Sequence, residues 1–126
     1  MICGVGIDMV EIDRIKSLYK EYGQRFLQRV FTDHEITYCT SKHNTSQHLS
    51  GRFAAKEAVA KALGTGMLTG IAFKDIEVVK HLGPPCITLH NRAEAMMKKL
   101  NISKIHLSIS HDAGLAIAFV ILESAR

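Results

Sequence analysis

The sequence predicts an α+β fold in which a small, mainly antiparallel sheet is packed with helices. Apolar residues recur at helical spacing through most of residues 11–63, whereas from residue 73 onward they alternate or cluster as in strands. Glycine and proline separate the later apolar segments at the short intervals that β-hairpins require. The length of 126 residues suits one domain with one core, residues 1–126.

The first third is predicted to contain one strand and two helices. Residues 2–7 form a short buried strand that ends at Asp8, and residues 11–20 form a helix. A second helix starts near Gln24. Both helices place arginine or lysine on their polar sides, so this region presents a basic surface. Such a surface is either an ordinary solvated face or a docking site for an acidic partner.

The middle of the chain is predicted to be helical. The Thr32 to Glu35 spacing is that of a capping box, which starts a helix running through Cys39. Residues 40–48 are polar and form a surface loop, and an alanine-rich helix follows over residues 47–63. Its small side chains allow another backbone or a flat ligand to approach closely. The glycine-punctuated residues 64–70 then form a loop that could bind phosphate with its amides or simply turn sharply.

The last third is predicted to consist of two hairpins with a helix between them. The final strand is almost entirely apolar, so we expect it to be buried on both faces. These elements are strands 76–79 and 86–89 with a turn at Gly83-Pro84-Pro85, helix 91–100, and strands 105–110 and 115–122 with a turn at His111-Asp112-Ala113-Gly114.

Composition narrows the class of partner. The net charge of +4 indicates an anionic partner, which can be nucleic acid, a phosphorylated cofactor or an acidic protein. Aromatic residues make up only 6% of the chain and sit mostly at apolar periodic positions, which argues against a nucleic-acid-binding module. There is no apolar run of membrane-spanning length and no signal peptide pattern, so a cytoplasmic protein without a membrane partner is expected. The three widely spaced cysteines predict reduced packing residues.

Charged residues within the alanine-rich helix are the first candidates for a site. Glu57 and Lys61 lie four residues apart and therefore share one face, with Arg52 on a neighbouring part of the surface. From this segment alone, a solvated ion pair and a functional cluster remain open. Asp8, at the end of the first strand, is equally compatible with a turn residue and a ligand.

Three separated motifs resemble one family. They are GVGIDMVEIDRI at residues 4–15, GRFAAKEAVAKALGTG at residues 51–66 and SISHD at residues 108–112. In this order and spacing they resemble the holo-acyl-carrier-protein synthases of the 4′-phosphopantetheinyl transferase superfamily, and the resemblance covers essentially the whole chain. It implies transfer of phosphopantetheine from coenzyme A to a serine of apo acyl carrier protein, with adenosine 3′,5′-bisphosphate as the other product.

The resemblance also implies roles for individual residues. Asp8 and Glu57 would hold Mg²⁺, which prefers carboxylate and phosphate oxygens, and Lys61 would act on the same phosphates or on the serine proton. Arg52 and His111 are expected near the 3′-phosphate and adenine end of coenzyme A. The nucleotide pocket would be shaped by Gly64, Thr65 and Gly66.

This chain departs from the family pattern in one turn, because Gly83-Pro84-Pro85 lacks the basic residue that the family often has there. Lys80 or His81 could supply a basic side chain in its place. The acceptor is expected to dock on the basic helices, through Arg14, Lys20, Arg25 and Phe26. Because the chain holds a single copy of a fold that larger members duplicate, the resemblance implies a homotrimer with sites between subunits.

A Mg²⁺-dependent nucleotide pyrophosphohydrolase, which would use the same carboxylates, is the competing enzyme hypothesis.

Overall fold

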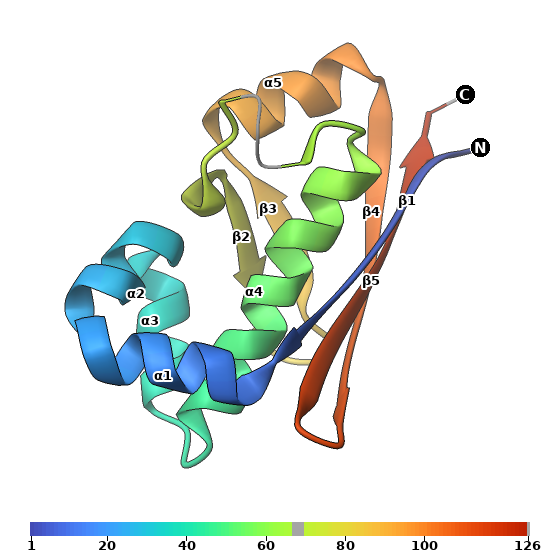
Figure 1. Cartoon of the computed structure of the whole chain (residues 1–126). Helices are drawn as coiled ribbons and strands as arrows, with labels where there is room; N and C mark the ends of the chain where they lie inside the picture. Colours follow the sequence, from blue (N-terminus) through green and yellow to red (C-terminus); the bar gives the residue numbers. More distant parts are fainter. Residues whose placement is uncertain (67–69, 126) are drawn as a thin grey trace.

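Two antiparallel sheets and five helices make up the fold of the computed structural model, which describes residues 1–66 and 70–125 (Figure 1). The larger sheet has the strand order β1-β5-β4, and β2 pairs with β3 in the smaller one. This confirms the predicted α+β class. The strands are β1 (Ile2–Glu11), β2 (Ile76–Val79), β3 (Cys86–Leu89), β4 (Ile102–Asp112) and β5 (Leu115–Ser124); the helices are α1 (Ile12–Tyr22), α2 (Gln24–Val30), α3 (Asp33–Thr40), α4 (Thr45–Ala62) and α5 (Asn91–Lys99).

Helix α4 is the centre of the molecule. It packs against the inner face of the three-stranded sheet on one side and against α1 and α3 on the other (Figure 1). Its alanines are almost completely buried, and β1 faces them with glycine. A Cβ on Gly4 or Gly6 would overlap the carbonyl oxygens of Ala62 and Ala58, so both glycines are required for this close approach. The contact brings Asp8, the next residue on that face of β1, alongside α4.

Local signals placed two helix ends correctly, the start of α3 and the end of α4. The Thr32 hydroxyl accepts a hydrogen bond from the Glu35 amide while the Glu35 carboxylate accepts one from the Thr32 amide, which is the predicted capping box. At the end of α4, Gly64 adopts φ +85°. The amides of Gly64 and Thr65 then donate to the carbonyls of Lys61 and Ala60, which closes the helix with a Schellman motif.

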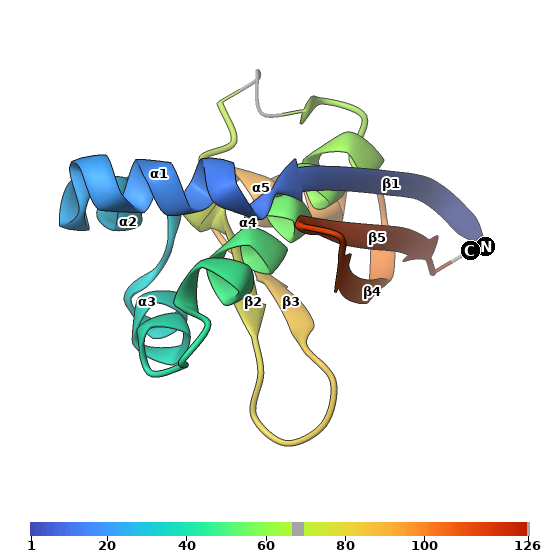
Figure 2. The same ribbon diagram turned by 60° about the horizontal axis from the view of Figure 1, so that its bottom comes forward.

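Several predicted boundaries differ from those of the structure. Strand β1 continues past residue 7 to Glu11, since it pairs with β5 along its length. The predicted loop over residues 40–48 overlaps α4, which already begins at Thr45. The connection between β2 and β3 occupies residues 80–85 and projects from the body of the molecule (Figure 2). Residues 67–69 of the predicted glycine-rich loop lie outside the described residues.

The second hairpin turns on two residues only. Ala113 and Gly114 have φ values of +51° and +79°, which is the backbone of a tight hairpin turn. His111 and Asp112 therefore belong to β4 rather than to the turn that was predicted to include them. This places the His111 side chain at the end of an edge strand, opposite Ala116.

The outer face of the larger sheet is apolar and uncovered in the single chain. Alternate residues of β5 face α4 and are buried, but Phe119 on the other face is 40% exposed. Ile7 and Met9 of β1 share that outer face and are 56% and 63% exposed. The prediction that the last strand is buried on both faces is therefore wrong for one chain alone.

Two further sequence-based expectations can be compared with the described residues. None of the helices described has the length and apolar character needed to cross a membrane. The cysteines are all free, but only Cys39 is a buried packing residue, whereas Cys3 and Cys86 are exposed.

Candidate active site

Asp8, Glu57 and Lys61 form one cluster where β1 meets α4. The Lys61 ammonium donates to Asp8 Oδ1 at 2.8 Å and to the Ile7 carbonyl at 3.0 Å. Lys61 thus pairs across the β1–α4 contact with Asp8, and not with Glu57 along the helix as helical spacing suggested. The Asp8 side chain is 17% exposed and that of Lys61 is 51% exposed, so the cluster opens to solvent.

The electrostatics of Glu57 suit a cation. Partial burial, and after it the charge of Asp8, raises the pKa of Glu57, while Lys61 and Arg14 act in the opposite direction. A bound dication would offset the unfavourable effect of the Asp8 charge on ionised Glu57, and an all-oxygen donor set suits a hard dication such as Mg²⁺. Within residues 1–66 and 70–125 no group of three or more histidine, cysteine or acidic side chains is arranged for a metal. A metal bound here would thus need ligands from water or substrate.

A hollow of about 430 Å³ adjoins this cluster. Its lining combines Asp8 and Lys61 with Ile7, Met9 and Ile117 of the outer sheet face. A molecule that covered the outer face of the sheet would therefore also form one side of the hollow beside Asp8 and Lys61.

A second cluster lies near the amino end of α4. Arg52 is only 5% exposed, and its Nε atom has no hydrogen-bond partner among the described residues. Its guanidinium carbon lies 4.2 Å from the centre of the Tyr38 ring. His111 approaches from β4, with its Nε2 atom 3.0 Å from Gln47 Nε2. These side chains border a hollow of about 180 Å³ lined by Tyr38, Gln47, His48, Gly51, Arg52, Lys80, Pro85, Ile109 and His111.

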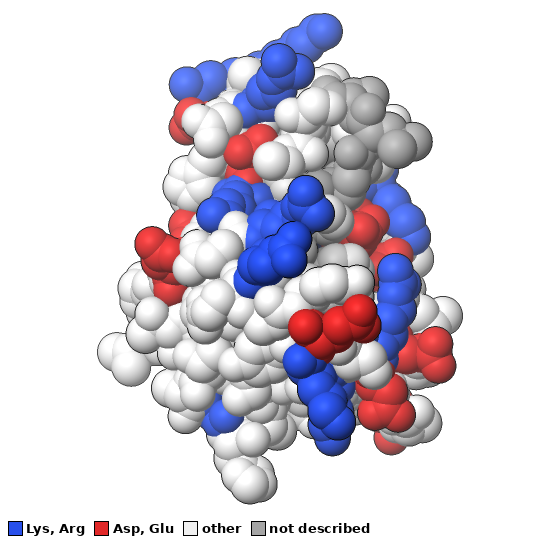
Figure 3. Space-filling model, turned by 60° about the vertical axis from the view of Figure 1, so that its left-hand side comes forward, with Lys and Arg blue, Asp and Glu red and all other residues white. Residues whose placement is uncertain are grey.

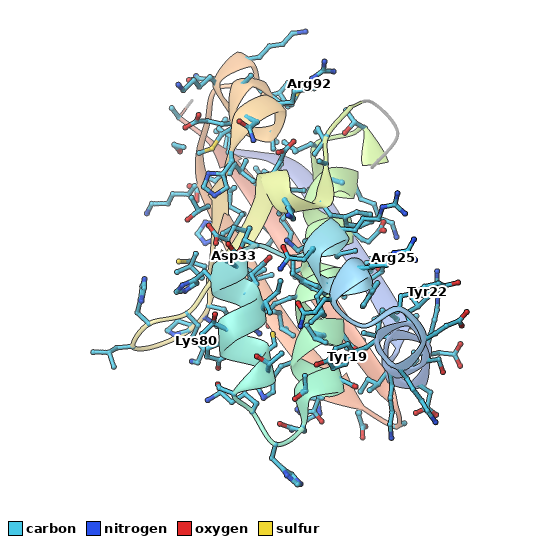
Figure 4. All side chains as sticks on the ribbon, turned by 90° about the vertical axis from the view of Figure 1, so that its left-hand side faces the viewer. Tyr19, Tyr22, Arg25, Asp33, Lys80 and Arg92 are labelled. Atoms are coloured by element: carbon cyan, nitrogen blue, oxygen red, sulfur yellow. The ribbon has the colours of Figure 1, made fainter. Side chains whose placement is uncertain are left out.

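The second hollow is electropositive. Partial burial lowers the pKa of His48, and the charges of Arg52 and Lys42 lower it further. Lys80 reaches the same hollow from the β2–β3 connection, on the side of the molecule where α3 lies (Figure 4). Of the two basic residues that could replace the missing one in the Gly83-Pro84-Pro85 turn, Lys80 lines the hollow. An anion is the ligand that this arrangement favours.

The predicted site residues therefore fall into two groups. Arg52 and Lys61 are nine residues apart on α4, or roughly 13 Å along the helix axis. Asp8 lies on β1 and His111 on β4, which form opposite edges of the three-stranded sheet. The structure brings Asp8 to Lys61 and Arg52 towards His111, but it does not bring the two groups together within one chain. The segment from Gly64 to Gly66 follows α4 at the end where Lys61 lies.

A basic groove lies between α1 and α2. It measures about 580 Å³ and is lined by Leu18, Tyr22, Arg25, Phe26 and Arg29. Figure 4 shows Tyr22 and Arg25 together at one side of the molecule, and Figure 3 shows basic side chains beside uncharged surface on the left-hand side of Figure 1. Of the four predicted docking residues, Arg25 and Phe26 line the groove, whereas Arg14 and Lys20 are exposed elsewhere on α1. Arg14 lies close enough to Glu57 to affect its pKa.

Sequence reasoning missed Tyr38, Gln47 and His48. Tyr38 lies within the predicted helix that runs through Cys39, and residues 47 and 48 lie where the predicted loop and the alanine-rich helix overlap. One signal was available, because His48 precedes Arg52 by four residues and so shares its face of α4. The approach of Tyr38 from another helix had no such signal.

Comparison with known proteins identifies the family of the chain. A profile of the 4′-phosphopantetheinyl transferase superfamily matches residues 4–120. The chain is 47% identical to holo-[acyl-carrier-protein] synthase of Geobacter sp. (strain M21), over 98% of this chain and 99% of that protein. It is 49% identical to the protein of the same name from Halothermothrix orenii, with 98% of each covered. It is also similar in structure to Helicobacter pylori holo-[acyl-carrier-protein] synthase in complex with coenzyme A, with a TM-score of 0.83, 40% identity, and 94% and 99% of the two chains covered.

Proposed function

This chain belongs to the 4′-phosphopantetheinyl transferase superfamily, and we propose that Asp8, Glu57 and Lys61 form its catalytic centre. It transfers the 4′-phosphopantetheine group of coenzyme A to a serine hydroxyl of apo acyl carrier protein. The serine oxygen forms a bond to the phosphorus next to pantetheine and its hydroxyl proton is released, while the pyrophosphate bond breaks and adenosine 3′,5′-bisphosphate leaves. The observation that carries the assignment of the centre is the contact of β1 with α4, which sets two carboxylates and a lysine beside one another.

The carboxylates Asp8 and Glu57 would hold Mg²⁺. The raised pKa of Glu57 and the exclusively oxygen donors support this choice of ion. When bound, the metal would neutralise charge that develops on the pyrophosphate as it is cleaved. Lys61 is already held against Asp8 and is half exposed, so its ammonium can contact a phosphate oxygen without a large movement. It would then orient the pyrophosphate next to the carboxylates.

The electropositive hollow would receive the 3′-phosphate end of coenzyme A. Arg52 and His111 supply the donors, and Lys80 adds a third basic side chain. A buried guanidinium whose Nε lacks a partner is costly unless an anion completes its hydrogen bonding, which supports a phosphate as the ligand. Gly64, Thr65 and Gly66 would contribute backbone to the nucleotide pocket.

The activity is tested by intact-mass spectrometry of an apo acyl carrier protein incubated with this protein, coenzyme A and Mg²⁺. We expect the carrier to gain the mass of one phosphopantetheine group, and to gain none when the metal is chelated. Cleavage of coenzyme A with an unmodified carrier would instead identify a pyrophosphohydrolase.

The groove between α1 and α2 would receive the acidic carrier protein. Arg25 and Arg29 offer charge, and Phe26 and Leu18 offer apolar contact within one surface. Arg14 links this surface to the catalytic centre, because its charge reaches Glu57. A carrier docked here would thus have its serine near the carboxylates.

Charge reversal by Arg25→Glu should raise the KM for carrier protein several-fold and leave the KM for coenzyme A unchanged, because it weakens only the encounter with the acidic partner. The effect should shrink at high salt. Arg25 is preferable to Arg14 for this test, since Arg14 also influences Glu57. Lys98→Glu is the matched control, with the same charge change on the exposed face of α5. An equal rise in both KM values for Arg25→Glu would contradict docking in the groove.

A complete site would be assembled between subunits of a homotrimer. Three features support this: the two clusters are separated within one chain, the outer sheet face is apolar and exposed, and that face borders the hollow beside Asp8. Each active site would then combine Asp8, Glu57 and Lys61 of one subunit with His111 and Arg52 of its neighbour. A head-to-tail contact of this kind closes into a ring.

Mixing two inactive variants tests the shared site. His111→Ala and Glu57→Ala each remove one half of every site, but after subunit exchange at equal amounts about a quarter of the sites regain both halves. We therefore expect transfer activity to return on mixing, as measured by carrier mass. Continued inactivity despite exchange proven with labelled subunits would show that each chain carries its own complete site.

A further inference from the structure

Arg52 is held in an unusual way for a buried arginine. It makes no ion pair with a carboxylate among the residues that the structure describes, although it is only 5% exposed. Buried guanidinium groups ordinarily lie against acidic side chains, which cancel their charge. Here the neighbour is the Tyr38 ring, whose centre is 4.2 Å from the guanidinium carbon. An aromatic face stabilises a cation without neutralising it.

The Tyr38 ring also contacts two other basic side chains at this side of the hollow, those of Lys42 and His48. The Lys42 ammonium lies 4.8 Å from the ring centre, and the His48 ring meets it edge to face with a centroid separation of 5.8 Å. The ring itself lines the hollow. One side chain of α3 thus touches three basic residues, of which Arg52 is the buried one.

We propose that Tyr38 is a positioning residue that holds the Arg52 guanidinium in place for the 3′-phosphate of the donor without neutralising its positive charge. Tyr38 thereby makes the enzyme prefer coenzyme A to dephospho-coenzyme A. This inference rests on the proposed function, and it adds a residue that none of the three sequence motifs contains. The ring acts through Arg52. Without it the guanidinium loses both a stabilising contact and a fixed orientation, and the long side chain is free to adopt other rotamers.

The test compares two donors in the same protein preparation. Transfer to apo acyl carrier protein is measured with coenzyme A and with dephospho-coenzyme A, which lacks only the 3′-phosphate. For Tyr38→Leu we expect the KM for coenzyme A to rise about tenfold with little change in kcat, while the KM for dephospho-coenzyme A stays the same. Tyr38→Phe keeps the aromatic face and should preserve the wild-type preference. Tyr38→Met provides a second side chain without a ring, in case the Leu variant folds poorly.

A structural role for Tyr38 would give a different result. A general loosening of α3 would change both donors by the same factor, and that result, or no change with either donor, would overturn the proposal. Loss of preference in Tyr38→Phe would also overturn it, because the hydroxyl would then be the active group. In an Arg52→Met background, Tyr38→Leu should have no further effect on the donor preference.

The transfer activity and the positioning role of Tyr38 can be disproved separately. If the wild-type protein transfers nothing from coenzyme A, the proposed function is wrong. If it transfers phosphopantetheine but does not distinguish the two donors, the function stands and the positioning role of Tyr38 is wrong.

Discussion

Replacing Glu57 with glutamine should lower the rate of phosphopantetheine transfer at least about a hundredfold, because the variant removes one of two carboxylates that would hold the metal. The substitution keeps the size of the side chain. It should not destabilise the fold, because partial burial and Asp8 already raise the pKa of Glu57 and make its charge unfavourable in the folded chain. The expected signature is thus a large loss of transfer without a fall in melting temperature.

The rate is followed by carrier mass at several Mg²⁺ concentrations, alongside a thermal melt of the same sample. Glu94→Gln is the matched control, since Glu94 is exposed on α5 and lies in neither cluster. We expect this control to match the wild type in both measurements. Near-normal turnover by Glu57→Gln at ordinary Mg²⁺ concentration would remove Glu57 from the metal site.

Features that depend on neighbouring residues were predictable from the sequence. The capping box of Thr32 and Glu35 and the glycine that ends α4 both follow from side chains within a few positions of one another, and both are confirmed. The prediction that another backbone approaches the alanine-rich helix is also confirmed, although the sequence did not identify β1 as the partner. The type of each element followed in the same way from its apolar period.

Features that depend on distant residues were not predictable. Helical spacing put Lys61 next to Glu57, but β1 supplies Asp8 as a partner that lies fifty-three positions away in the chain. Arg52 was expected on the surface and is buried instead. Its guanidinium group packs against the ring of Tyr38, which comes from α3. Glu35 illustrates both cases at once: its capping role is local, yet its carboxylate also binds Lys56 of α4. Lys56 lies in the same motif as Lys61, residues 51–66, but the motif does not show that its partner is Glu35 of α3.

Lys56→Met should be the most destabilising of the substitutions considered. Both side chains of the Lys56–Glu35 pair are fully buried, with 2.8 Å between Nζ and Oε1. Lys56 also donates to the carbonyls of Phe73 and Ile76, and Glu35 Oε2 accepts from the Val78 amide, so the pair joins α3 and α4 to β2. Removing one partner leaves an uncompensated buried charge, which costs about 3–5 kcal/mol. For a chain of this size we expect a fall in melting temperature of roughly 10–20 °C.

Lys61→Met is the matched control for this prediction, because it makes the same substitution five residues later on the same helix. The Lys61–Asp8 pair is partly exposed, so its loss should change the free energy of unfolding by less than about 1 kcal/mol while transfer activity falls. The double variant Lys56→Met, Glu35→Gln should be more stable than Lys56→Met alone, because no unpaired charge remains buried. All melts are recorded at one protein concentration, since assembly also affects stability. A melting temperature for Lys56→Met within a few degrees of the wild type would show that the buried pair does not hold α3, α4 and β2 together.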